Sequence, residues 1–158
     1  MLNHFQIVGI DPAQFNHLFD WSEAALHKIN AIRQKVDQQP GFPCRVSLQD
    51  ATIGEEVILL PFTHHAVDAP YRATGPIYIR KNAQMANLAI DEIPQLLRHR
   101  LLALRAYDEG GMMQMAQTVD GQKLEPVIQS MLAQSNIQYI QVHNAGPGCY
   151  NCQINRVP

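Results

Sequence analysis

The chain has 158 residues, of which 46% are hydrophobic and only 16% are charged, and its formal net charge is -2. This length and composition predict a single domain over residues 1–158 with a full hydrophobic core. Binding to nucleic acid or to an anionic membrane requires clustered Lys and Arg side chains, which the sequence lacks, so neither partner is expected.

The three cysteines, Cys44, Cys149 and Cys152, are an odd number in a chain too long for a small secreted scaffold. They therefore predict reduced thiols in a cytoplasmic protein. The N-terminus lacks the basic and apolar regions of a secretion signal. The longest dense apolar run, residues 57–62, is far shorter than the roughly 20 residues needed to cross a bilayer.

The first forty residues are predicted to form a helical segment. Asp11 and Pro12 are typical of a helix start, and Asp20 with Glu23 resembles a capping box. Four apolar residues then follow at helical spacing, which predicts an amphipathic helix over 21–38: Ala25, Ile29, Ile32 and Val36.

Residues 41–158 are predicted to form a sheet-containing body. Strands are expected at 45–48, 56–62, 77–80, 101–107, 112–119, 137–142 and 150–157, and helices at 91–99 and 122–133. A long connection over 63–76 separates the second and third strands. Because the other links between strands have hairpin length, the prediction is an α+β fold: a mainly antiparallel sheet with helices packed on one face.

Six segments of this body carry a family resemblance: GFPCRVSL (41–48), GEEVILLPF (54–62), HHAVDAPYRATGPIYIR (64–80), LRAYD (104–108), VHNA (142–145) and GCY (148–150). In this order they resemble the uncharacterised bacterial family called domain of unknown function twelve hundred and three. The resemblance covers nearly all of the chain from about Pro40 onward. It implies a free-standing bacterial domain and brings no activity with it.

The connection 63–76 concentrates polar side chains, namely His64, His65, Asp68, Tyr71 and Arg72. Histidine exchanges protons near neutral pH, and arginine binds carboxylate or phosphate through paired hydrogen bonds. The structural alternative is equally weighted: the histidines bond to backbone groups, and Asp68 and Arg72 form a salt bridge.

A second group of candidate residues surrounds the turn 144–148. His143 and Asn144 precede the turn, and Cys149 follows it. Such a turn can present amides to an anion, and a cysteine becomes nucleophilic when a histidine favours its thiolate. The alternative is a hairpin turn followed by a buried thiol, which the residue preferences favour.

Zinc binding is a third possibility, because Cys149 and Cys152 have the C-x-x-C spacing of zinc sites. On a strand, however, residues three apart point to opposite faces. Further ligands would have to come from residues distant in sequence: Cys44, His64, His65 and His143.

The leading hypothesis is a small-anion or small-ligand site at one edge of the sheet, formed by residues 64–72 and 143–149. Arg72 is expected to bind the anion, with Arg45 or Arg105 as further contacts. Arg105 shares a strand face with Tyr107 and needs a partner, for which Asp68 or Asp108 is expected.

Whether the chain is an enzyme is left open. If it is, the catalytic candidates are His64, His65, His143 and Cys149. The alternatives are a non-catalytic homodimeric interaction module and a zinc-binding protein, and the sequence identifies no cofactor. The motifs of P-loop, Rossmann, zincin and α/β-hydrolase proteins are absent.

Overall fold

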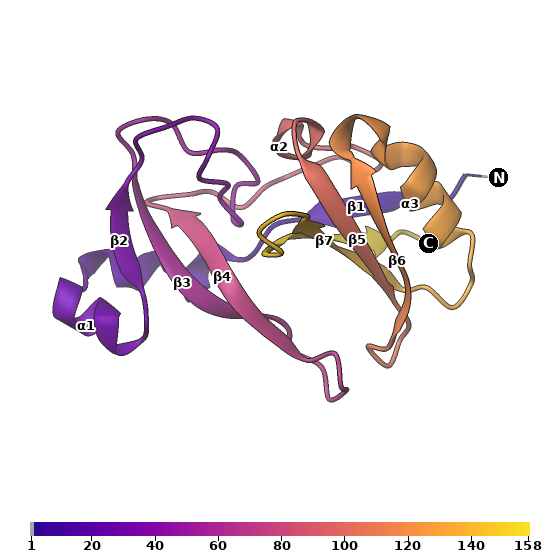
Figure 1. Cartoon of the computed structure of the whole chain (residues 1–158), viewed down its shortest axis with the longest axis horizontal. Helices are drawn as coiled ribbons and strands as arrows, with labels where there is room; N and C mark the ends of the chain where they lie inside the picture. Colours follow the sequence, from indigo (N-terminus) through magenta and orange to yellow (C-terminus); the bar gives the residue numbers. More distant parts are fainter. Residues whose placement is uncertain (1) are drawn as a thin grey trace.

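The computed structural model describes residues 2–158, which form two antiparallel sheets (Figure 1). The five-stranded sheet has the order β1 (Phe5–Val8), β8 (Tyr150–Arg156), β7 (Tyr139–Asn144), β5 (Leu101–Tyr107) and β6 (Met113–Asp120). The three-stranded sheet has the order β2 (Ile32–Lys35), β3 (Glu56–His65) and β4 (Ala73–Arg80). The helices are α1 (Glu23–Lys28), α2 (Gln95–Arg98) and α3 (Leu124–Leu132), with single 3-10 turns at Pro12–Gln14, Asn16–Asp20 and Gly121–Lys123. The predicted α+β, mainly antiparallel fold is confirmed.

The five-stranded sheet has one apolar and one polar face because its side chains alternate along each strand. Leu102, Leu104, Ile140 and Val142 point to the apolar face and are buried in the larger core. Helix α3 covers this face with four apolar residues at helical spacing, Leu124, Ile128, Met131 and Leu132. The opposite face is left free to meet the second sheet.

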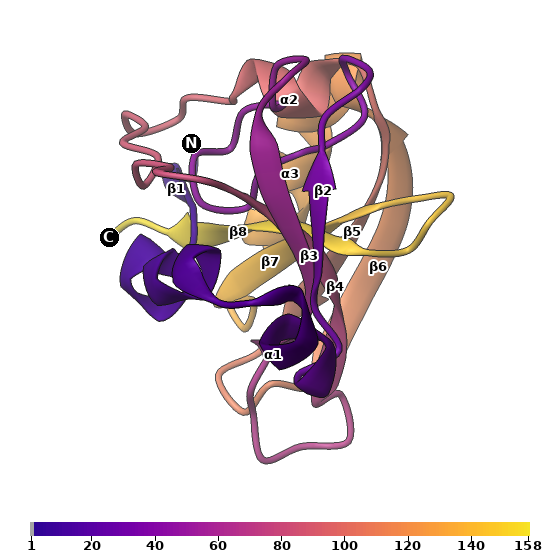
Figure 2. The ribbon, with the colours of Figure 1, turned by 90° about the vertical axis from the view of Figure 1, so that its left-hand side faces the viewer.

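The three-stranded sheet has a core of its own at the other end of the molecule. Ile58, Leu60, Ile77 and Ile79 pack there against the apolar side chains of the N-terminal segment, which include Phe15, Phe19 and Leu26. Figure 2 shows β3 in front, running across the direction of β7 and β8 behind it. The division into two sheets was not predicted.

The predicted helix over 21–38 is wrong beyond its first turns. Helix α1 ends at Lys28, Asn30 has a positive φ of 60°, and residues 32–35 form β2 beside β3. The cap is Ser22, whose Oγ accepts a hydrogen bond from the amide of Ala25. The helical spacing of apolar residues was misleading here. Ile32, which a helix would bury, is exposed, and its neighbour Ala31 is buried instead.

Three other predicted elements need correction. Residues 44–48 form a turn, closed by a hydrogen bond from the Leu48 amide to the Cys44 carbonyl, and not a strand. Helix α2 is much shorter than 91–99, because the Asp91 carboxylate accepts the Phe5 amide and ties this segment to β1. The connection between β3 and β4 covers only 66–72, since β3 continues through His65. The helices of the described chain include none long and apolar enough for a membrane span.

Candidate functional site

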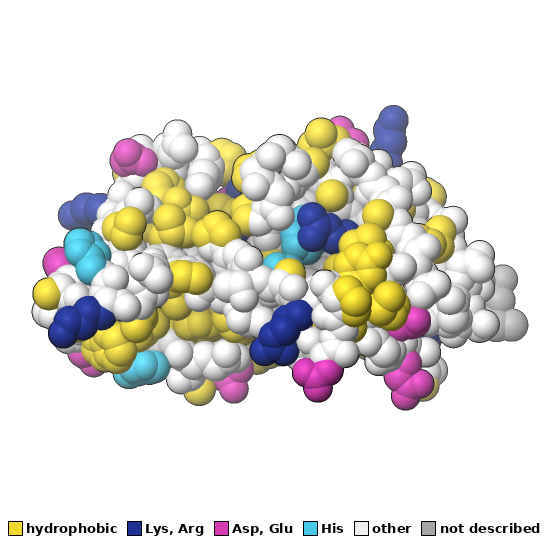
Figure 3. Space-filling view, turned by 60° about the horizontal axis from the view of Figure 1, so that its bottom comes forward, with side chains coloured by type: hydrophobic (Ala, Val, Ile, Leu, Met, Phe, Trp, Pro, Cys, Tyr) yellow, Lys and Arg dark blue, Asp and Glu magenta, His cyan; other side chains and the backbone are white. Residues whose placement is uncertain are grey.

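The end of β3 brings His64 against the polar face of the five-stranded sheet. Its ring centroid lies 5.0 Å from that of His143 on β7, and it stacks on Tyr150 at 5.1 Å with the ring planes 10° apart. Two stretches more than seventy residues apart in sequence therefore meet, as the leading hypothesis requires. Figure 3 shows histidine side chains beside a cationic one near the middle of the surface in view.

Gln141 fixes the orientation of His64. The Gln141 amide nitrogen donates to the His64 carbonyl at 2.7 Å, so its Oε1, 2.9 Å from His64 Nδ1, is the acceptor there. His64 consequently carries its proton on Nδ1, and Nε2 has a free lone pair. Burial lowers the pKa of His64, and the positive charge of Arg105 lowers it further against the bond from Gln141. His64 is thus a neutral, half-buried imidazole at neutral pH.

His143 is more deeply enclosed, with 1% of its surface exposed. Its Nδ1 donates to the Gly148 carbonyl at 3.0 Å, while its buried Nε2 has no hydrogen-bond partner among the described residues. Burial lowers its pKa from 6.5 to about 4, with Arg105 and His64 adding to the effect. A buried imidazole in this state has lone-pair capacity that the protein leaves unused.

Arg105 lies opposite Gln141 in the pairing of β5 with β7, on the same face as His143. Neither expected partner reaches it. The Asp108 carboxylate accepts the amides of Gly110 and Met112, and Asp68 is exposed on the connection 66–72. Within residues 2–158 no ion pair of Arg105 is found.

His65 points to a separate aromatic group. Its Nδ1 donates to the Tyr71 carbonyl at 2.8 Å, and its Nε2 accepts from the Tyr139 hydroxyl at 2.6 Å. Its ring also packs on Tyr107, with centroids 4.1 Å apart. Because both ring nitrogens are occupied, His65 anchors the tip of β3 and offers no lone pair to a ligand.

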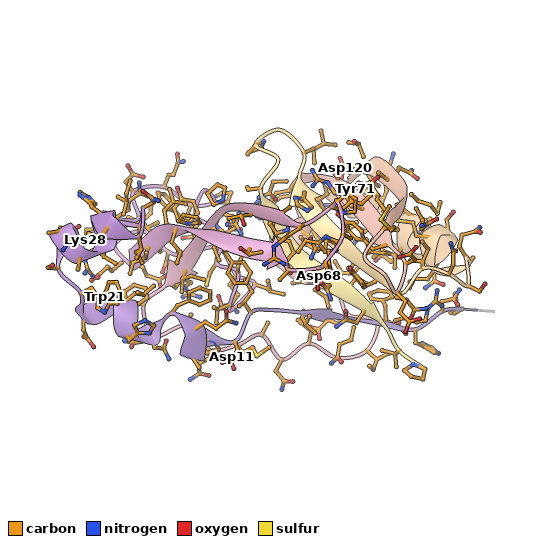
Figure 4. All side chains as sticks on the ribbon, turned by 90° about the horizontal axis from the view of Figure 1, so that it is seen from below. Asp11, Trp21, Lys28, Asp68, Tyr71 and Asp120 are labelled. Carbon is orange, nitrogen blue, oxygen red and sulfur yellow. The ribbon has the colours of Figure 1, made fainter. Side chains whose placement is uncertain are left out.

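The remaining predicted residues divide between two places. Arg72 is exposed, and within residues 2–158 the one hydrogen bond of its side chain goes to the Val67 carbonyl, at 3.3 Å. Figure 4 shows Asp68 and Tyr71 on this connection, where it reaches over the five-stranded sheet. Arg45, Asn144 and Cys149 instead form a corner at the beginning of β8. Cys149 Sγ accepts hydrogen bonds there from Arg45 and Asn144, and no hydrogen bond joins it to a histidine among the described residues.

Gln141 and Tyr150 are the site residues that sequence reasoning missed. Gln141 is 1% exposed yet polar, and it stands between the apolar residues Ile140 and Val142 of β7. That position was a usable signal, because a buried amide in a strand needs partners from another element. Its partners here are His64 and Gln153.

The zinc alternative loses support. Across the described residues no group of three or more His, Cys, Asp or Glu side chains is arranged to hold a metal. Cys152 lies in the larger core on the opposite face from His143, as the alternation of the strand requires.

The family described as "Protein of unknown function (DUF1203)" matches residues 41–156. The chain belongs to this family. No curated protein and no solved structure matched the chain. The residues matched by the DUF1203 family include His64, His143, Arg105 and Cys149. They do not include β1, α1 and β2. The resemblance from about Pro40 onward is thereby confirmed.

A further hollow of this DUF1203 protein has neither His64 nor His143 in its lining. It has a volume of about 1100 Å³ and is lined mainly by residues 80–88, with Asp50, Glu92 and His99. Its charged side chains are engaged: Arg80 with Glu55 at 2.8 Å, and Asp50 with both His99 and Arg100. Arg105, in contrast, has a positive charge without an ion-pair partner among the described residues. This difference in charge distinguishes the surroundings of His64 and His143 from the hollow.

Proposed function

We propose that this protein binds a small anion beside Arg105 and His64 on the polar face of the five-stranded sheet. The observation that carries the proposal is the sign of the local charges. The charges that act on His64 and His143 come from Arg105 and from other histidines, with no carboxylate among them. A cation held beside neutral imidazoles without a counter-ion is a place where an anion gains free energy.

The state of His64 also indicates what kind of anion fits. Its Nε2 lone pair accepts a hydrogen bond from a ligand oxygen that carries a proton, as in hydrogen phosphate. A bare anion beside the ring instead raises the His64 pKa, so that binding is accompanied by proton uptake. Either route makes small oxyanions the preferred ligand class. Catalysis is not part of this proposal, since His65 is fully hydrogen-bonded and His143 is enclosed.

Arg105→Gln is expected to weaken the binding of inorganic phosphate or sulfate about tenfold or more, because it removes a charge-assisted hydrogen bond. Titration calorimetry at constant ionic strength, in buffers of different ionisation enthalpy, measures both the affinity and the proton uptake. Arg72→Gln is the matched control, since it removes an exposed arginine from the connection 66–72.

The two variants distinguish an anion site at Arg105 from the site at Arg72 that the sequence predicts. A loss of affinity confined to Arg72→Gln would place the anion on the connection. Equal affinity in both variants and the wild type, or no binding of either anion, would contradict the proposal.

A second candidate function is homodimerisation through the free edge of β6. Three edges of the sheets are protected: β2 carries Arg33 and Lys35, β1 is covered by the segment around Asp91, and β4 bonds to the turn at Arg45. In contrast, β6 has eight residues and no charge before its terminal Asp120. Long uncharged edges pair readily with another strand.

Ala116→Lys is expected to convert such a dimer to a monomer, because two lysines would face each other across the paired edges. Light scattering over about a hundredfold range of concentration measures the mass, in a range that brackets micromolar affinity. His27→Lys adds the same charge on exposed α1 as a control. A wild-type chain that stays monomeric throughout would remove this candidate.

We also propose that residues 1–158 act as one domain in the cytoplasm. Strand β1 joins the N-terminal segment to the five-stranded sheet, and the bonds between His64 and Gln141 join the two sheets. The three cysteines are free thiols, which supports a reducing compartment.

A further inference from the structure

Both histidines of the proposed anion site use their ring N–H groups on acceptors of the protein itself. The Nδ1 of His64 donates to Gln141 Oε1 at 2.9 Å. The Nδ1 of His143 donates to the Gly148 carbonyl at 3.0 Å. A neutral imidazole has one N–H and one lone pair, so each Nε2 is an acceptor only. The two rings, whose centroids lie 5.0 Å apart, therefore have lone pairs and no donor for a ligand.

The lone pair of His64 is the one that a ligand can reach. Among the described residues no hydrogen bond to His64 Nε2 is found, and this atom is not one of the buried polar atoms that lack a partner. It is therefore open to solvent, whereas His143 Nε2 is enclosed. A ligand oxygen that lies against the His64 lone pair makes a hydrogen bond when it carries a proton. A bare oxygen in the same place brings two acceptors together, which is unfavourable.

A chain of carboxamides on β7 and β8 fixes the proton of His64 on Nδ1. The His64 carbonyl can only accept, so the nitrogen of the Gln141 amide has to face it, at 2.7 Å. The same nitrogen donates to Gln153 Oε1 at 3.2 Å, and Gln153 Nε2 donates in turn to Asn155 Oδ1 at 2.8 Å. Both N–H groups of the Gln141 amide are thus used, and its oxygen is left as the acceptor for His64 Nδ1.

We propose that this site selects oxyanions that retain a proton at neutral pH, of which inorganic phosphate is the simplest, over bare oxyanions such as sulfate. The inference rests on the proposed function, because it concerns the anion beside Arg105. The charged oxygens of the ligand interact with the Arg105 guanidinium, and its O–H group donates to His64 Nε2. Sulfate keeps the first interaction and loses the second. Gln141 sets the preference as a positioning residue, since it acts through His64.

The surroundings of the two rings oppose the alternative, in which a histidine takes up a proton and donates to a bare anion. Burial lowers the pKa of both rings, and the positive charge of Arg105 lowers it further. The hydroxyl of Tyr150, whose ring stacks on His64, stays neutral because burial raises its pKa. Within the described chain no carboxylate acts on either ring to stabilise an imidazolium.

Titration calorimetry of the intact chain with inorganic phosphate and with sulfate, at neutral pH and constant ionic strength, tests the inference. Phosphate is expected to bind about tenfold or more tightly, because sulfate sets a bare oxygen against the His64 lone pair. Sulfate carries at least as much charge as phosphate at neutral pH, so charge alone does not give this order. Similar affinities for the two anions would overturn the preference and leave the anion site at Arg105 in place. Binding of neither anion would remove the proposed function and this inference together.

Gln141→Leu tests the positioning role. It removes the acceptor of the His64 N–H, so that His64 can carry its proton on Nε2 and donate to sulfate. The ratio of the two affinities is then expected to fall below about threefold. Gln138→Leu makes the same change at an exposed position before β7 and should keep the ratio of the wild type. An unchanged ratio in Gln141→Leu would show that Gln141 does not set the preference.

The tautomer of His64 can also be measured without a change at Gln141, which keeps the inference testable if Gln141→Leu does not fold. Nitrogen NMR of the wild-type chain at neutral pH distinguishes a protonated from an unprotonated ring nitrogen, and His64→Gln assigns the signals. We expect the proton on Nδ1 and an unprotonated Nε2. A proton on Nε2 would contradict the inference.

Discussion

The free energy of unfolding is expected to fall by about 2 kcal/mol between about pH 7 and about pH 5, through His143 alone. In the folded chain burial lowers its pKa from 6.5 to about 4. The unfolded chain therefore binds a proton as the pH passes below 6.5, while the folded chain does not until about 4. The contribution of His143 to stability is therefore fully present above the pKa of the unfolded chain. It is lost as the pH falls from that pKa to the pKa of the folded chain.

The comparison variant is His143→Gln, which removes the titrating group and keeps a polar side chain. Its stability should change by about 2 kcal/mol less than that of the wild type between the same two pH values. His27→Gln, on the exposed face of α1, serves as the control and should follow the wild type. Urea denaturation at both pH values gives the three differences. Parallel pH profiles for all three proteins would show that His143 is not buried in its neutral form.

Gly9→Ala is expected to destabilise the fold by about 3 kcal/mol, because a methyl group has no room there. A Cβ at Gly9 would lie 2.3 Å from the carbonyl oxygen of Val46, which is backbone and cannot rotate away. That oxygen accepts the Ala86 amide at 2.9 Å, so a shift of the turn 44–48 also breaks this bond. Gly9 thus permits the close approach of the chain after β1 to the turn that carries Arg45.

Gly146→Ala is the matched control for this change. Nothing lies within 4 Å of its Cβ position, and it is exposed in the turn before Cys149. Its effect on thermal or urea unfolding should stay within about 0.5 kcal/mol. Similar stability of the two variants would indicate that the chain at Gly9 adjusts freely.

The alternation along single strands was predictable from sequence. In β5 the residues Leu102 and Leu104 are buried in the larger core, and Arg105 shares the other face with Tyr107, as the period of two requires. The hairpin β5–β6 and helix α3 were also predicted close to their observed bounds. These features depend on neighbours a few residues away, which periodicity describes well.

The N-terminal segment shows where that reasoning fails. A spacing of i, i+4, i+7 and i+11 over Ala25, Ile29, Ile32 and Val36 is compatible with a helix, yet Ile32 pairs with Leu59 in a sheet. The interaction that decides the conformation lies 27 positions away, so no local pattern contains it. Tertiary pairing overrides helix preference because the latter amounts to only tenths of a kcal/mol per residue.

By itself the sequence determined the fold class, the faces of the central strands and the segments that contain the candidate residues. The tertiary structure decided which of those residues lie together. It packed His64 against His143, near enough to Arg105 for its charge to lower the pKa of His64. It bonded His65 to Tyr139 and Arg45 to Cys149. The physical reason is that charge and hydrogen-bond partners are chosen in space, between strands distant in sequence, whereas propensity and periodicity act along the chain.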